Sequence, residues 1–206
     1  ILLAFEIDID SDVIDQALSL YDDFDEPENP VPVVKVEEDL YVSELYHGPT
    51  RAFKDMALQP FGVILSDLAV KRNENYLVLA ATSGDTGPAA LETFKNKTNV
   101  KVSCLYPDGG TSDVQRLQMV TENAANLKVI GIHGDFDDAQ SALKMLLASD
   151  KFKNKLKEKH TYLSAANSVN FGRIIFQIIY HIYSYLELVR QNAISLGEEV
   201  YLNVPS

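Results

Sequence analysis

Short apolar runs alternate with helix-length segments along the middle of this chain, and this alternation restricts the possible folds more than any other feature. The runs are rich in β-branched residues and too short for helices, so they are predicted as buried strands. The expected order is strand 76–81, helix 86–95, strand 100–106, helix 112–123, strand 127–133 and helix 136–148. Buried strands joined by helical crossovers form parallel sheets with helices on both faces. We therefore expect a three-layer α/β fold.

The segments on either side of this block are predicted from shorter signals. We expect strands at 33–36, 40–46, 161–165 and 199–204, a helix after the turn at 47–50, a polar lysine-rich segment at 151–159, and a long helix at about 170–194. Pro60 lies inside the first of these helices and is expected to kink or restart it, because proline has no backbone N–H.

Composition narrows the class of protein and its partners. The chain has 206 residues, of which 46% are apolar and 23% charged, as in ordinary soluble globular proteins. Its formal net charge of −12 repels phosphate backbones and anionic lipids, so we expect neither a nucleic-acid nor a membrane partner. The apolar stretch 171–189 contains Arg173, Gln177, His181 and Glu187, so it is predicted as a buried helix and not as a membrane span.

The cysteine and histidine content gives two further expectations. Cys104 is the single cysteine and forms no internal disulfide, which favours a cytoplasmic location. The four histidines show no ligand spacing, so no metal site is predicted.

Lys54 is the first candidate for chemistry. It follows a strand-turn junction and stands between Phe53 and the start of a predicted helix. Partial desolvation there disfavours the charged ammonium form of the lysine, and the neutral amine is a nucleophile. The alternative is a solvated helix lysine whose stem lies over Phe53.

The segment Thr82-Ser83-Gly84-Asp85-Thr86-Gly87-Pro88-Ala89-Ala90 is the second candidate, between a buried strand and a helix. Its glycines permit close backbone approach, and hydroxyls and helix N-terminal N–H groups make a cradle for phosphate or carboxylate. The alternative is a plain turn capped by Asp85 or Thr86. The spacing fits neither a Walker loop nor the dinucleotide fingerprint.

A third polar cluster, at 165–173, precedes the most apolar helix. Asn167 or Ser168 can serve as the helix cap. Arg173 is not explained by capping, because a guanidinium in an apolar helix needs an acidic or phosphate partner.

Four motifs, in order and approximate spacing, resemble those of the threonine synthases, a family of tryptophan-synthase-like (fold type II) pyridoxal-phosphate enzymes. They are His47-Gly48-Pro49-Thr50-x-Ala52-Phe53-Lys54-Asp55, Ser83-Gly84-Asp85-Thr86-Gly87-Pro88-Ala89, Gly134-Asp135-Phe136-Asp137-Asp138-Ala139-Gln140 and Asn167-Ser168-Val169-Asn170. The resemblance runs from about Val33 to Pro205, the N-terminal and central portion of such an enzyme. Serine dehydratases and cystathionine synthases typically carry asparagine where Asp85 stands.

The resemblance implies a lyase of threonine biosynthesis that converts O-phospho-L-homoserine and water to L-threonine and phosphate by γ-elimination and β-hydration. It implies that Lys54 holds pyridoxal 5′-phosphate as a Schiff base and moves protons, with Phe53 and Asp85 beside the cofactor. The substrate is then bound by two groups of residues: Ser83, Gly84, Thr86 and Gly87 at its carboxylate, and Asn167, Ser168 and Arg173 at its phosphate.

The resemblance also implies a division of the chain. Residues 73–159 are expected to form a small mobile subdomain inserted in a larger domain made of residues 1–72 and 160–206, with hinges near Asn73 and His160. In the family a Gly-Asn-Phe-Gly type loop that binds the cofactor phosphate follows the segment matching residues 204–206. We therefore expect the larger domain to be incomplete here and this chain alone to be inactive.

Three other functions remain open from the sequence. The protein could be another fold type II pyridoxal-phosphate lyase or dehydratase acting on a hydroxy- or phospho-amino acid. It could instead be a non-catalytic anion-binding domain that uses residues 83–87, or a structural fragment whose long apolar helix binds a partner.

Overall fold

The centre of the fold is a parallel sheet of four strands in the order β5-β4-β3-β6. The computed structural model describes residues 9–168 and 170–204, so Val169 and Pro205 of the motif region lie outside it. The strands are β3 (Asn75–Ala81), β4 (Val100–Pro107), β5 (Leu127–Ile132) and β6 (Thr161–Ala165). The three strands predicted in the alternating block are confirmed. The strand predicted at 161–165 is also present, and it pairs with β3 in the same sheet.

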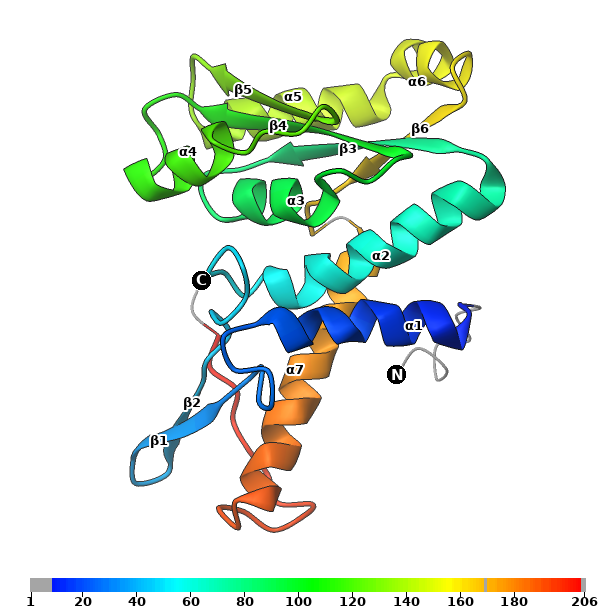
Figure 1. The fold of residues 1–206 in the computed structure, drawn as a ribbon. Helices are drawn as coiled ribbons and strands as arrows, with labels where there is room; N and C mark the ends of the chain where they lie inside the picture. The colour runs from blue at the N-terminus through cyan, green and yellow to red at the C-terminus, as the bar shows by residue number, and fades with distance from the viewer. Residues whose placement is uncertain (1–8, 169, 205–206) are drawn as a thin grey trace.

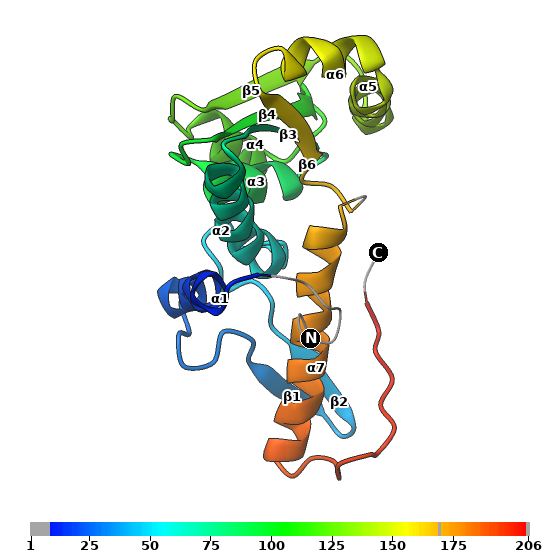
Figure 2. The same ribbon diagram turned by 90° about the vertical axis from the view of Figure 1, so that its right-hand side faces the viewer.

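Helices cover both faces of this sheet (Figures 1 and 2). Side chains alternate along each strand, so successive residues of β3 enter two separate cores. One core joins Val78, Ala80, Val102 and Cys104 to α3 (Thr86–Phe94) and to Met119 of α4 (Asp113–Val120). The other joins Leu79, Ala81 and Leu105 to Ala139 and Leu143 of α5 (Phe136–Ala148). The expected three-layer α/β architecture is confirmed.

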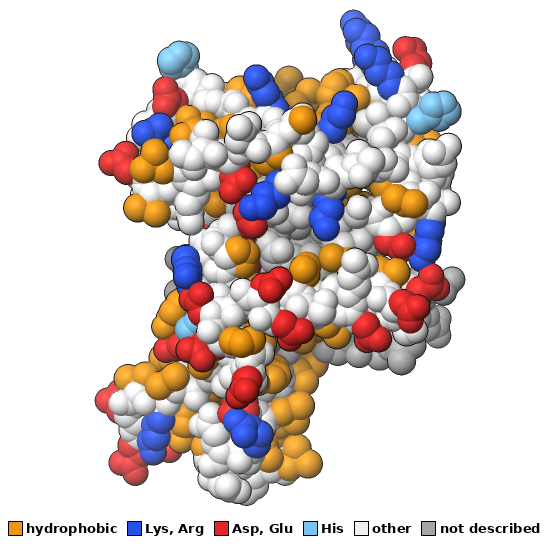
Figure 3. Space-filling view, in the orientation of Figure 1, with side chains coloured by type: hydrophobic (Ala, Val, Ile, Leu, Met, Phe, Trp, Pro, Cys, Tyr) orange, Lys and Arg blue, Asp and Glu red, His pale blue; other side chains and the backbone are white. Residues whose placement is uncertain are grey.

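The remaining elements lie beside and below the sheet in Figure 1. They are α1 (Ser11–Leu18), the 3-10 helix η2 (Ser19–Asp23), α2 (Asp55–Arg72), α7 (Phe171–Arg190), and an antiparallel hairpin of β1 (Val33–Glu37) and β2 (Leu40–Ser43). Gly172 allows α7 to approach α2 closely, because a Cβ at Gly172 would lie 2.8 Å from the Phe61 ring. The hairpin exposes Val34, Val36, Leu40 and Val42, and apolar side chains gather at this end of the molecule in Figure 3.

The helix does not restart at Pro60, which was one of the two outcomes expected there, because α2 runs unbroken from Asp55 to Arg72. Proline at position 60 removes the N–H that would bond to the carbonyl of Met56. The Tyr21 hydroxyl donates to that carbonyl instead, at 2.5 Å. A distant side chain thus replaces the missing helical donor, which local sequence rules do not anticipate.

Two other segments differ from expectation. The lysine-rich segment forms a helix, α6 (Asp150–Lys157), whose first turn is capped by the Ser149 hydroxyl accepting from the Phe152 N–H. The strand expected at 199–204 is absent, since these residues have no regular secondary structure. Among the described residues, no helix is long and apolar enough to cross a membrane.

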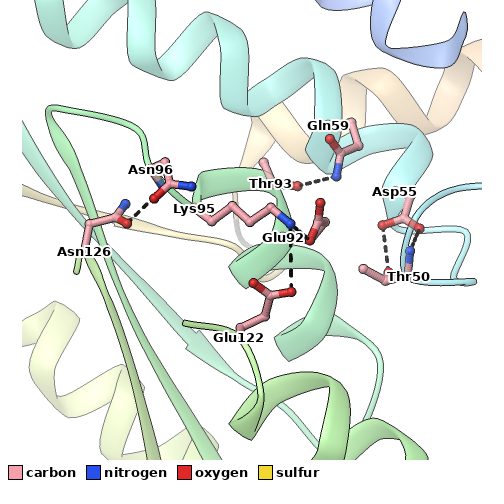
Figure 4. A network of polar contacts seen from close by, with 9 residues as sticks. All are labelled: Thr50, Asp55, Gln59, Glu92, Thr93, Lys95, Asn96, Glu122 and Asn126. Atoms are coloured by element: carbon pink, nitrogen blue, oxygen red, sulfur yellow. Dashed lines mark hydrogen bonds and ion pairs between the residues drawn. The ribbon is translucent and has the colours of Figure 1, made fainter. Parts of the chain in front are cut away.

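Asn126 ties α3 to the strands of the sheet, and Figure 4 shows its contact with Asn96. Its Nδ2 donates to the carbonyls of Phe94 and Val100, both at 2.8 Å, and its Oδ1 accepts from the Asn96 N–H at 3.0 Å. These groups lose their partner in Asn126→Ala. We expect this substitution to lower the free energy of unfolding by about 2 to 3 kcal/mol. Urea unfolding measures the change.

The matched control is Asn123→Ala, which removes an exposed asparagine three residues earlier. We expect this variant to unfold at the same urea concentration as the parent. Equal stability of the two variants would contradict the role given to Asn126.

Candidate active site

Asp55 fixes the turn that precedes Lys54. Its side chain is fully buried, its Oδ2 accepts from the Thr50 N–H at 2.8 Å, and its Oδ1 accepts from the Thr50 hydroxyl at 2.7 Å (Figure 4). Burial raises the pKa of Asp55, whereas the bonds from Thr50 lower it. A side chain at Gly48 would lie 2.5 Å from the Asp55 Cβ, so only glycine fits there. The turn therefore presents Lys54 at a defined place.

Lys54 lies at the N-terminal end of α2 and is only 9% exposed. Its Nζ donates to Asp85 Oδ2 at 2.6 Å and lies 4.1 Å from the centre of the Phe53 ring. Burial lowers the pKa of Lys54, the bond and charge of Asp85 raise it, and the positive charge of Arg173 lowers it further. The alternative of a solvated lysine is therefore wrong. The structure instead brings together three predicted residues, Lys54, Phe53 and Asp85.

The loop after β3 forms an open cradle. The Gly84 N–H donates to Thr82 Oγ1 at 2.9 Å, which bends the chain into α3. In the part of the chain that the structure describes, the N–H groups of Asp85, Thr86 and Gly87 have no acceptor. Free N–H groups at a helix N-terminus attract anions. The alternative of a turn capped by Asp85 or Thr86 is wrong, because neither side chain makes a capping bond.

Helix α4 forms one wall of this cradle. A Cβ at Gly84 would lie 2.6 Å from Gln115 Oε1, and a Cβ at Gly87 would lie 2.4 Å from Met119 Sδ. Gln118 Nε2 donates to the Thr50 carbonyl at 3.2 Å and so joins α4 to the turn before Lys54. These contacts were not predicted, because glutamines three residues apart on a helix carry no local signal.

The cluster before α7 holds the ends of two strands. Asn167 Oδ1 accepts from the Ala81 N–H at 3.3 Å, and its Nδ2 donates to the Ala81 carbonyl at 3.1 Å. The helix cap is Asn170, whose Oδ1 accepts from the Gly172 N–H at 2.9 Å. The expectation that Asn167 or Ser168 caps the helix is therefore wrong. Ser168 is exposed, and the substrate roles of both residues stay predictions.

Arg173 is 6% exposed, and its guanidinium N–H groups are only partly hydrogen-bonded among the described residues. Its Nη1 donates to the Ala166 carbonyl at 3.0 Å, but its buried Nε has no partner among the described residues. Burial lowers the pKa of Arg173, and the charge of Asp85 raises it. Because Arg173 and Asp85 both act on Lys54, the three charged groups lie in one region. An unpaired guanidinium N–H there suits an anionic ligand.

The chain is similar in sequence to proteins named threonine synthase and threonine synthase-like 1. No family model matches the chain. The threonine synthase of Pseudomonas aeruginosa is 41% identical over 157 residues, which are 76% of this chain and 32% of that protein. The human protein named threonine synthase-like 1 is 37% identical over 181 residues, 85% of this chain and 24% of that protein.

A solved structure of pyridoxal-phosphate-bound threonine synthase from Brucella melitensis matches with a TM-score of 0.78 and 34% identity. The match covers 88% of this chain and 38% of that one. The chain thus spans less than two fifths of the length of each of these relatives. Over the segment that it shares with them, this chain is a homologue of the threonine synthases.

Proposed function

We propose that this protein is a threonine synthase, which converts O-phospho-L-homoserine and water to L-threonine and phosphate with pyridoxal phosphate as cofactor. The observation that carries the proposal is the charged group of buried Lys54, half-buried Asp85 and buried Arg173. One guanidinium N–H of this group has no partner among the described residues. The cofactor of the Brucella relative and the names of the relatives support it. A cytoplasmic location and a small-molecule substrate belong to the same proposal.

The residues around Lys54 fit a covalently held cofactor. Burial favours the neutral amine, which is the form that attacks a carbonyl. Phe53 and Asp85, in contact with the Lys54 amine, would lie beside the cofactor. Pyridoxal phosphate, when bound, supplies the electron sink that stabilises negative charge next to the substrate α carbon.

The cradle at residues 83–87 would bind the substrate carboxylate. Its free N–H groups at Asp85, Thr86 and Gly87 supply donors without a side-chain rearrangement. The hydroxyls of Ser83 and Thr86 also make no hydrogen bond within the described ranges, 9–168 and 170–204, so they add two donors. Fixing the carboxylate there would orient the α proton.

Lys54 would then move protons. The reaction takes protons from the α and β carbons and adds water at the β carbon, and a single amine near both carbons can exchange them. Asp85, which accepts from Nζ at 2.6 Å, holds the amine in one position and stabilises it whenever it carries the proton. The lowered pKa of Lys54 makes the amine available as a base nearer to neutral pH.

Arg173 would bind the phosphate group that leaves the γ carbon. Its buried Nε has no partner in residues 9–168 and 170–204, and in such an environment a charged hydrogen bond to an oxyanion is strong. Holding the phosphate in place also separates it from the α carbon. The proposed site thus has a carboxylate end at α3 and a phosphate end at α7.

We also propose that residues 73–159 move relative to the rest during catalysis. Asn73 and His160, at the two expected boundaries, both have left-handed backbone conformations, with φ of 50° and 49°. The Asn75 N–H donates to the His160 carbonyl at 2.9 Å, so the two expected boundaries lie side by side. Strand β6 pairs with β3 and would travel with this block, so the second boundary of the moving part would lie after Ala165 and not at His160. Closure would exclude water from the reacting groups.

The test uses the full-length protein that contains this chain. With pyridoxal phosphate we expect a visible absorption band, which borohydride reduction should fix onto Lys54 as a mass increase located by peptide mapping. With O-phospho-L-homoserine we expect threonine and phosphate in equal amounts. A protein that forms no such band would contradict the cofactor assignment and favour an anion-binding domain.

The similarity to human threonine synthase-like 1 favours a second candidate, a pyridoxal-phosphate enzyme of the same family with another hydroxy- or phospho-amino acid substrate. A protein that fixes the cofactor on Lys54 but releases no phosphate from O-phospho-L-homoserine would support this second candidate.

A further inference from the structure

Two buried donors without acceptors lie one helical turn apart on α7. They are Arg173 Nε and Gln177 Nε2, and neither has a partner in the described part of the chain. Residues four apart on a helix lie on the same face, so both donors belong to one side of α7. The coincidence of two unsatisfied donors on one face indicates a missing acceptor.

This face of α7 is directed toward the elements around Lys54. The same face continues along α7 to Tyr180, which belongs to a core cluster with Met56. Phe53 packs against this cluster. Further on, the Ser184 hydroxyl bonds with the Ser43 hydroxyl at 2.8 Å. At the other end, Arg173 interacts electrostatically with Lys54 and Asp85. Gln177 therefore lies between the charged group and the Tyr180 cluster.

The unpaired amide contrasts with other side-chain amides of this protein. Asn126, Asn167 and Gln191 each bond to backbone groups. A buried amide without an acceptor destabilises a fold, and an apolar residue of equal size would be better there. Its presence at position 177 is explained when a ligand supplies the acceptor.

We infer that Gln177 is a substrate-binding residue whose amide donates to the same oxyanion as Arg173 Nε. The inference rests on the proposed function, in which Arg173 binds the phosphate of a phosphorylated amino acid. A phosphate group has three free oxygens and can accept from a guanidinium and an amide at once. The substrate carboxylate has its own donors at α3. Gln177 thus adds a neutral donor that binds phosphate without adding positive charge beside Lys54.

The test is Gln177→Met in the full-length, cofactor-loaded protein, with inorganic phosphate as the probe. Calorimetric titration should show a dissociation constant for phosphate about tenfold or more above that of the parent, because one hydrogen bond to a charged group is lost. Without phosphate, the variant should unfold at an equal or higher urea concentration, because an unsatisfied amide is removed. A residue with only a structural role would give the opposite change in stability.

Gln191→Met is the matched control, because it makes the same substitution at the end of the same helix. The Gln191 amide bonds to the Val33 carbonyl at 3.0 Å and to Glu187 at 2.9 Å. We expect lower stability and unchanged phosphate affinity. Gln177→Glu, which keeps the shape and adds negative charge, should weaken phosphate binding more than the methionine variant does.

Unchanged phosphate affinity in Gln177→Met, or no phosphate binding by the parent, would overturn the inference and leave a buried water as the partner of Gln177. A parent that takes up no cofactor would contradict the proposed function instead. Phosphate titration of that unloaded protein and its Gln177→Met variant would still decide the role of Gln177.

Discussion

Replacing Lys54 with alanine is expected to abolish threonine formation from O-phospho-L-homoserine, by at least about a thousandfold in turnover, while the protein stays folded. Alanine has no amine to hold the cofactor or to move protons. The fold should tolerate the loss, since the Asp85 side chain is 37% exposed and can be solvated when Nζ is absent. Threonine and phosphate release measure turnover, and the visible absorption of the cofactor measures its attachment.

Lys71→Ala is the matched control for this prediction. Lys71 lies near the other end of α2, and its ion pairs with Asp10 and Asp67 are on the surface. We expect this variant to keep full turnover and to lose little stability, as is usual for exposed ion pairs. A Lys54→Ala protein that still makes threonine would contradict the role of Lys54 as base and cofactor anchor.

The parallel sheet was predictable because its strands are short apolar runs that need burial on both faces. Val78 and Leu79 show why, since adjacent residues of β3 enter different cores. The same reasoning failed at residues 199–204, which are as apolar as a strand but have no strand to pair with in the described structure. Strand formation depends on a neighbouring strand that is often distant in sequence, as β6 is from β3, and the hydrophobic pattern of one segment does not report it.

The structure of α2 depends on a contact that no local rule contains. Pro60 is a helix breaker by its chemistry, and the prediction of a kink or a restart followed from that, but the helix does not restart there. The Tyr21 hydroxyl, 35 residues away from Met56 in sequence, satisfies the freed carbonyl. Tertiary hydrogen bonds of this kind override local propensity and become visible only in three dimensions.

The candidate site was predictable where its residues carry a local signal. Lys54 stands at the start of α2, and residues 83–87 lie between β3 and α3, so each segment could be singled out as the beginning of a helix. Asp55 and Gln118 act by binding the backbone of Thr50. Gln177 is recognised only because its amide nitrogen has no acceptor within the described part of the chain. Such supporting contacts depend on the arrangement of three helices and leave no pattern in the sequence.

Replacing Arg173 with lysine is expected to lower kcat/KM for O-phospho-L-homoserine. The expected loss of transition-state stabilisation is about 2 to 4 kcal/mol, as for loss of one preorganised donor. Lysine keeps the charge, but its ammonium is a single point on a flexible stem and does not reproduce a planar guanidinium with several fixed N–H groups. Stability should change little, because the substitution removes the unpaired Nε together with one bond to the Ala166 carbonyl. Steady-state kinetics and urea unfolding measure the two effects.

Arg190→Lys supplies the control on the same helix, since the Arg190 side chain is 73% exposed and pairs with Glu187 away from Lys54. We expect its kcat/KM to equal that of the parent. Inorganic phosphate separates the possible roles of Arg173: if the guanidinium binds the leaving group, phosphate should inhibit Arg173→Lys much more weakly than the parent. If kcat/KM and phosphate inhibition are both unchanged while stability falls, Arg173 instead balances the charge of Asp85 and holds the Ala166 carbonyl. The phosphate end of the proposed site would then have to be assigned to other residues.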